Sequence, residues 1–150
     1  MVLATPTFSL DGALDAVEQY RKALAIQEKL AADVSAVPEY RRDLADSHNN
    51  LGIPLKSLGQ TREAEEQYRK GLVIYEKLAA DFPSVVAYRL GLASNETNLG
   101  GLLNEIGKRP EAEEQYQKAL GIRGGLSPNT PQCRITGMAW PAATTALEFC

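Results

Sequence analysis

Apolar and small side chains recur at steps of three and four residues along most of this chain. The first such segment runs through residues 14–33, and its apolar or small positions are Ala16, Tyr20, Ala23, Leu24, Ile26, Leu30 and Ala31. Steps of three and four place these side chains on one face of a helix, with Glu18 and Lys22 on the other. The pattern predicts an amphipathic helix whose apolar face must be covered by another element.

The same pattern returns four more times, separated by residues that begin or end helices. Pro38 and Pro110 suit the first turn of a helix, whereas Gly59 and Gly107 accept the left-handed conformation that follows a helix end. These signals predict helices at about residues 11–33, 38–58, 61–81, 85–106 and 110–123. Pro54 lies inside the second helix and removes a backbone hydrogen bond at a cost of about 3 kcal/mol. We expect a kink or a local break there.

Three copies of one segment lie at a fixed spacing. Tyr20, Tyr68 and Tyr116 each follow a similar Ala-x-Glu-Gln sequence, and successive tyrosines are 48 positions apart. A constant spacing of this size is typical of stacked structural units rather than of one central core. Tyr40 and Tyr88 also lie one repeat apart at apolar positions, and both are expected to pack in the core.

The two ends of the chain do not follow the repeat. Residues 1–10 show no copy of it, and we expect an irregular lead-in there, followed by the array over residues 11–123. The third copy departs from the pattern after Arg123, where Gly124 and Gly125 stand. Residues 124–150 are rich in proline and threonine and nearly free of charge, so we expect a poorly ordered tail. The abrupt change raises the hypothesis of a truncated or frame-shifted gene.

Composition and charge narrow the classes of function. The 150 residues suit one domain, and a net charge of −3 without a basic cluster speaks against nucleic acid as a partner. No apolar run approaches the ~20 residues that a membrane span needs. No basic segment precedes the apolar residues near the N-terminus, as it would in a secretory signal. We therefore expect a cytoplasmic protein without a membrane partner.

Residue types that carry catalysis or bind metals are sparse. His48 is the only histidine, and we expect it to be a polar surface residue rather than a catalytic one. Cys133 and Cys150 lack the spacing of a zinc site. Acidic runs such as the one around Glu65 suit the first turn of a helix, where they complement its dipole. The chain has no Gly-rich phosphate loop and no hydrolase signature, so we expect no enzymatic activity, no cofactor and no metal.

The repeated helix pairs resemble the tetratricopeptide repeat. The matching positions are Leu51, Gly52, Leu55, Gly59, Ala64, Tyr68, Gly71 and Leu72 in the first pair, and Leu99, Gly100, Leu103, Gly107, Ala112, Tyr116, Ala119 and Leu120 in the second. The resemblance spans about residues 14–123 and implies an all-α, right-handed superhelical solenoid of antiparallel helix hairpins. The unit is longer than the usual ~34 residues, and in this it resembles the repeats of kinesin light chains. Small Gly52 and Ala64 are expected to let paired helices approach, while Tyr68 and Leu72 fill the space between units.

The resemblance also implies where a partner would bind. In tetratricopeptide arrays the first helix of each unit lines a concave groove, which implies that Asn50 and Asn98 face it. An asparagine side chain offers a donor and an acceptor to an extended peptide backbone. The candidate peptide-binding residues on this basis are Asn49, Asn50, Lys56, Asn98 and Asn104. Lys56 is the one cation placed on this side, so a lysine-rich clamp for a C-terminal carboxylate is not expected.

Three functions remain open at this point. The first is a protein–protein interaction module that holds a peptide or helix of a partner in the concave groove. The second is a structural repeat that forms homo-oligomers, because the apolar stripes at both ends of the array lack a cover. The third is a regulatory fragment of a larger signalling protein, because similar repeat runs lie behind bacterial serine/threonine kinase domains.

Overall fold

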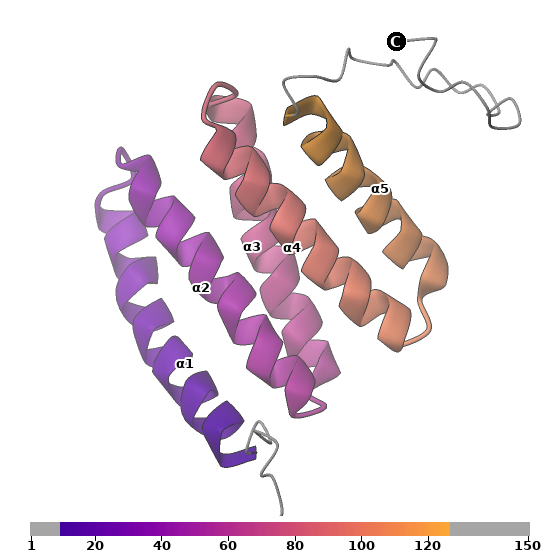
Figure 1. Ribbon diagram of the computed structural model, residues 1–150. Coiled ribbons are helices and arrows are strands. Elements are labelled where there is room, and N and C mark those ends of the chain that lie inside the picture. The colour runs from indigo at the N-terminus through magenta and orange to yellow at the C-terminus, as the bar shows by residue number, and fades with distance from the viewer. Residues whose placement is uncertain (1–9, 127–150) are drawn as a thin grey trace, which may run out of the picture.

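The computed structural model describes residues 10–126, which form five α-helices and no strand. The helices are α1 Leu10–Asp33, α2 Pro38–Ser57, α3 Thr61–Asp81, α4 Val86–Glu105 and α5 Arg109–Leu126. They stand in a row with α1 and α5 at its ends, and α3 lies behind α2 and α4 (Figure 1). The predicted all-α array of antiparallel hairpins is thus confirmed. The predictions for residues 1–9 and 127–150 lie outside the described residues.

Each repeating unit is one helical hairpin, and the described residues contain two complete hairpins. α2 pairs with α3 and α4 pairs with α5, while α1 packs on α2 and α3 packs on α4. Gly59 and Gly107 follow the ends of α2 and α4 with φ angles of 73° and 81°. This left-handed conformation is open to glycine without steric cost, and it lets the chain reverse direction between paired helices.

Helix α2 does not break at Pro54, so of the two expectations, a kink or a local break, the break is wrong. The helix continues through this buried residue and ends one turn after it, at Ser57. The N–H of Leu58 donates to the Pro54 carbonyl at 3.0 Å, and the N–H of Gln60 donates to the Leu55 carbonyl at 2.9 Å. Because Pro54 lies in the last turn of α2, few helical hydrogen bonds follow it that the proline could disturb.

Helix α5 extends further than the sequence predicts. It passes Arg123 and continues through Gly124 and Gly125 to Leu126. Each glycine costs only about 1 kcal/mol relative to alanine in a helix. Arg123 Nη2 donates to Thr97 Oγ1 on α4 at 3.3 Å, so the last turns of α5 remain attached to the preceding helix.

The core runs along the row of helices. Its main cluster joins Val17 and Leu24 of α1 to buried residues of all the later helices, namely Leu51, Leu55, Ala64, Tyr68, Leu99, Leu102, Leu103 and Ala112. Gly52 allows a close approach, because a Cβ atom there would lie 2.5 Å from the Tyr68 ring. Gly100 takes the same role against Tyr116, at 3.0 Å. The expectation that Gly52 lets paired helices approach is therefore confirmed.

The two layers of the array are held together differently. The backbones of α2 and α4 approach each other closely, whereas those of α1, α3 and α5 stay further apart. The latter are linked by ion pairs, Arg21–Glu63 at 2.6 Å and Arg69–Glu111 at 3.3 Å. The closer approach of α2 to α4 makes their side the inner side of the array.

The outermost helices keep apolar side chains exposed. Leu30 in α1 is 40% exposed, whereas Leu78, at the equivalent position of α3, is fully buried. Ile26 in α1 and Leu120 in α5 are 63% and 61% exposed. Each inner helix packs on helices at both sides, whereas each end helix packs on one helix within the described residues. Apolar side chains on the outer faces of α1 and α5 therefore stay exposed.

Candidate functional site

A hollow of 480 Å³ lies between α2 and α4, with α3 at its floor. We call it the α2–α4 hollow, and its lining residues are Arg42, Asp46, Asn49, Asn50, Tyr75, Ala87, Leu90, Gly91 and Ser94. It lies on the inner side of the array, where the two first helices of successive units meet. Concave sites with a few convergent polar groups are the usual places where proteins bind ligands.

The two walls of this hollow come from equivalent positions of the repeat but differ in chemistry. Arg42, Asp46 and Asn50 follow one another at steps of four, so they share one face of α2. One repeat later the positions of Arg42 and Asp46 hold Leu90 and Ser94. The α2 wall is therefore charged and polar, and the α4 wall is uncharged.

Tyr75 of α3 forms the floor between these walls. Its side chain is 3% exposed, and its ring lies against Gly91, where a Cβ atom would overlap it. The Tyr75 hydroxyl donates a short hydrogen bond to Asp46 Oδ1. Burial and this bond to a carboxylate raise the pKa of Tyr75. The hydroxyl therefore stays protonated and holds Asp46 in place.

The two charged side chains that line the hollow are paired unequally. Arg42 donates from Nε and Nη2 to Asp43 Oδ1, at 3.3 and 2.9 Å, and this contact raises the pKa of the guanidinium. Asp46 forms no ion pair with any residue of the described part of the chain. The guanidinium is thus held by Asp43, and the Asp46 carboxylate is left without an ion pair.

Three of the five predicted binding residues come together here. Asn49 and Asn50 line the hollow, and Asn98 Nδ2 donates to Asn49 Oδ1 across the two helices at 3.0 Å. Lys56 lies two turns along α2 and pairs with Glu105 of α4 at 2.6 Å, so its charge is compensated. Asn104 is exposed and does not line the hollow.

Sequence reasoning missed the residues that shape the rest of the site. Arg42 and Asp46 could have been found by continuing the face of Asn50 toward the start of its helix at steps of four. Leu90 and Ser94 follow from them by the repeat spacing. No sequence signal identified Tyr75, because it comes from the second helix of the unit and reaches the hollow through the space that Gly91 leaves.

The expectation that His48 lies on the surface is wrong. Its side chain is 4% exposed, and Nδ1 donates to Gln67 Oε1 at 2.7 Å. Burial lowers the pKa of the imidazole, although the bond to Gln67 opposes this shift. His48 is therefore a neutral, hydrogen-bonded residue between α2 and α3.

One repeat later, an acidic residue takes the place of His48. Glu96 is 3% exposed, and its Oε2 atom has no hydrogen-bond partner among residues 10–126. The Oε1 atom of Gln115, which stands where the first unit has Gln67, is also without a partner in that range. Burial raises the pKa of Glu96 from 4.5 to about 7; the Lys118 charge lowers it and the Glu76 charge raises it.

The expectation for the two tyrosines holds for one of them. Tyr88 is 5% exposed and packs edge-on against Phe82, with ring centroids 5.9 Å apart. Tyr40 is 36% exposed, because the position equivalent to Phe82 holds the smaller Val34. Its predicted place in the core is wrong.

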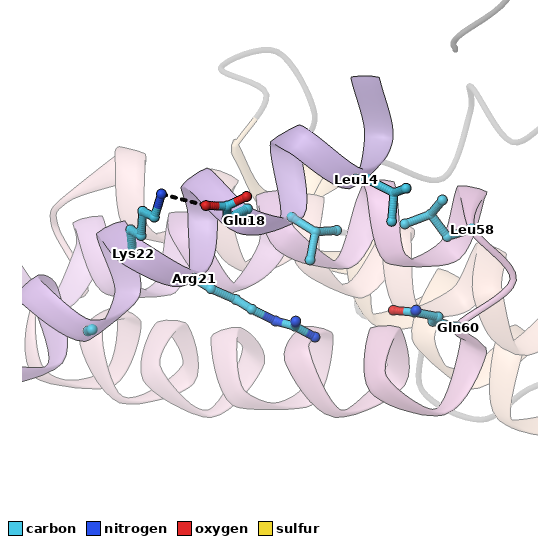
Figure 2. A pocket seen from close by; sticks show the side chains of 8 residues that line it. Leu14, Glu18, Arg21, Lys22, Leu58 and Gln60 are labelled. Atoms are coloured by element: carbon cyan, nitrogen blue, oxygen red, sulfur yellow. Dashed lines mark hydrogen bonds and ion pairs between the residues drawn. The ribbon is translucent and has the colours of Figure 1, made fainter. Parts of the chain in front are cut away.

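A second hollow, of 590 Å³, lies between α1 and the turn that joins α2 to α3 (Figure 2). Leu14, Val17 and Leu58 supply much of its apolar lining. Its charged residues are already paired, Lys22 with Glu18 at 2.6 Å and Arg21 with Glu63 at the same distance. This hollow offers a ligand little unpaired polarity.

Neither hollow has the groups that a metal centre needs. Within residues 10–126, no three His, Cys, Asp or Glu side chains gather in a way that could hold a metal ion. No helix in that range is long and apolar enough to cross a membrane.

Comparison with known families gave one match. The family model described as a tetratricopeptide repeat matches residues 44–84 and 97–124. These segments cover most of the α2–α3 hairpin, the second half of α4 and nearly all of α5. Comparison with curated proteins and with solved structures gave no match.

Proposed function

This chain is a repeat protein of the tetratricopeptide type, and on that premise we propose that its α2–α4 hollow binds a short extended segment of a partner protein. Repeats of this type generally serve as protein–protein interaction modules and are typically non-enzymatic. The observation that carries the proposal is the meeting of two side-chain amides and an apolar wall in one hollow on the inner side of the array.

The amide groups suit an extended backbone. Within the described part of the chain, the side-chain amide of Asn50 has no hydrogen-bond partner, although the residue is half-buried. The bond from Asn98 to Asn49 fixes the neighbouring amides across the two helices. A donor and an acceptor held in this way can meet the C=O and N–H of one peptide unit.

The uncharged wall supplies the apolar contact. Leu90 is 48% exposed, and Ala87, one turn before it on α4, lines the same wall. A partner side chain placed there would remove apolar surface from water at about 25 cal/mol per Å². Affinity would thus come from this wall, and backbone orientation from the asparagines.

Selection from a phage-displayed peptide library tests this proposal directly. Selected peptides would be synthesised with a fluorophore, and their affinity measured by fluorescence anisotropy against the wild type and Leu90→Gln. This change removes the apolar contact without altering the charge of the hollow, so it should weaken binding. Val73→Gln is the matched control, since Val73 is a 63% exposed apolar residue of α3 outside the hollow.

A finer test concerns the asparagines. Asn50→Ala should weaken the selected peptides, and Asn104→Ala, an exposed amide outside the hollow, should leave their affinity unchanged. If Leu90→Gln binds the peptides as the wild type does, the α2–α4 hollow is not the binding site.

Self-association is a second candidate function, favoured by the exposed apolar side chains of α1. Leu14 and Ile26 are 53% and 63% exposed, and Leu14 also lines the hollow in Figure 2. Light scattering over a range of concentrations would show a mass that rises with concentration, and Leu14→Glu with Ile26→Glu should suppress the rise. A monomer at all concentrations excludes this function.

A further inference from the structure

We propose that the segment held in the α2–α4 hollow carries an arginine or lysine side chain whose cationic group pairs with the Asp46 carboxylate. This inference rests on the proposed function and adds the chemistry of the partner. It depends on the charges around Asp46, on how Asp46 is held, and on the wall opposite to it.

The pairing of charges at the hollow favours a cation. Arg42 is the only basic side chain of the described residues that lines it, and two of its N–H groups already bind Asp43. Asp46 also lines the hollow, and no described residue forms an ion pair with it. A cationic ligand would give the Asp46 carboxylate the ion pair that it lacks, whereas an anionic ligand would meet it without one.

The Asp46 carboxylate is held ready for such a ligand. Its Oδ1 atom accepts the hydrogen bond from the buried Tyr75 hydroxyl, which fixes the orientation of the group. A carboxylate can accept several further bonds, and Asp46 is half-buried and open to the hollow. A group fixed before binding loses less conformational entropy when it binds.

The opposite wall fits the aliphatic part of the same side chain. Arginine and lysine bury their methylene stems along apolar surface and keep the charged head at a polar group. Leu90, Ala87 and Gly91 provide such a surface across from Asp46. A site for an acidic segment would need a cation at the equivalent position of each unit, but Leu90 stands where the first unit has Arg42.

The inference is tested with the peptides selected from the library. In each peptide, every arginine is replaced in turn by citrulline and every lysine by norleucine, which removes the charge and keeps most of the shape. At one of these positions the replacement should weaken binding to the wild-type protein about tenfold, as expected for a charge-assisted hydrogen bond. This measurement needs no protein variant, so a folding defect cannot confuse it.

Asp46→Asn then identifies the acceptor. This variant should weaken the unmodified peptide by the same factor and leave the affinity of the neutral peptide unchanged. Glu39→Gln is the control, since it also removes one carboxylate from α2, lies outside the hollow and leaves the pair of Arg42 and Asp43 intact. It should leave the preference for the basic residue intact.

Three results would overturn the inference. They are selected peptides without a required basic residue, selected peptides with a required acidic one, and equal effects of Asp46→Asn and Glu39→Gln. Each leaves the proposed function standing if Leu90→Gln still weakens binding. An affinity that Leu90→Gln leaves unchanged overturns both the inference and the proposed function.

Discussion

Replacing Glu96 by glutamine should stabilise the protein above neutral pH. Glu96 lies 3% exposed between α4 and the helices beside it, and its Oε2 atom has no hydrogen-bond partner among the described residues. Burial penalises the charged carboxylate and raises the pKa of Glu96 to about 7. Glutamine has nearly the same shape and never carries the charge, so Glu96→Gln removes the penalty without leaving a cavity.

The magnitude follows from the shift in pKa. A rise from 4.5 to about 7 corresponds to a penalty of about 3 kcal/mol for the ionised form at alkaline pH. Relaxation of the chain around a buried charge reduces this value, so we expect Glu96→Gln to raise the free energy of unfolding by about 1–3 kcal/mol at pH 8.

The sign of the pH dependence is opposite to the usual carboxylate case. The folded pKa of Glu96 lies above the unfolded value, so the favourable contribution of the neutral acid is fully present below pH 4.5. It is lost as the pH rises toward about 7. The difference between Glu96→Gln and the wild type should therefore be small at pH 4.5 and reach its full size near pH 8.

Urea unfolding followed by circular dichroism, at several pH values, measures this difference. Glu113→Gln, which neutralises an exposed carboxylate of α5, is the control and should change stability little at any pH. Because only the difference between variant and wild type is used, titration of other groups cancels. A difference that is constant with pH, or a destabilised Glu96→Gln at pH 8, would refute the reasoning.

Three further predictions concern the packing, the histidine and the ion pairs. Gly52→Ala should destabilise the protein by about 1–3 kcal/mol in urea unfolding, because its Cβ would lie 2.5 Å from the buried Tyr68 ring, whereas Gly12→Ala, in open space on α1, should not. The lowered pKa of His48 means that its neutral form favours folding, so stability should fall as the pH drops below 6.5, and His48→Gln should flatten that fall. Arg69→Gln, which breaks one ion pair within α3 and one between α3 and α5, should cost under about 1 kcal/mol in thermal unfolding at low salt and nothing measurable at high salt.

Much of the fold was predictable because helices depend on neighbours along the chain. Apolar steps of three and four, glycines after Leu58 and Ile106, and prolines at helix starts specify the helices without reference to distant residues. The fixed spacing of Tyr20 and its two copies then requires that the helices stack as repeats. Pro54 shows the limit of the local rule, since its cost depends on how close it lies to the helix end.

The candidate site was predictable only in part, for a related reason. The resemblance to a repeat family implied that Asn50 and Asn98 face the groove, and the structure places Asn50, with the neighbouring candidate Asn49, in the lining of the α2–α4 hollow. The sequence could not show that Tyr75 reaches Asp46 from a different helix. That contact exists because Gly91 leaves room for the ring, and it depends on the distance between helices rather than on spacing along one of them.

The amino-acid sequence thus determined the helices, their pairing into hairpins and the order of the units, because each follows from interactions within a few turns. Only the tertiary structure decided which side chains meet across units. The repeat places Asn98 at the position equivalent to Asn50. In the structure, however, the side chain of Asn98 binds that of Asn49 rather than that of Asn50. Equivalent positions of parallel neighbouring helices point in the same direction, so their side chains do not face each other. Contacts between such helices therefore join positions that are not equivalent in the repeat.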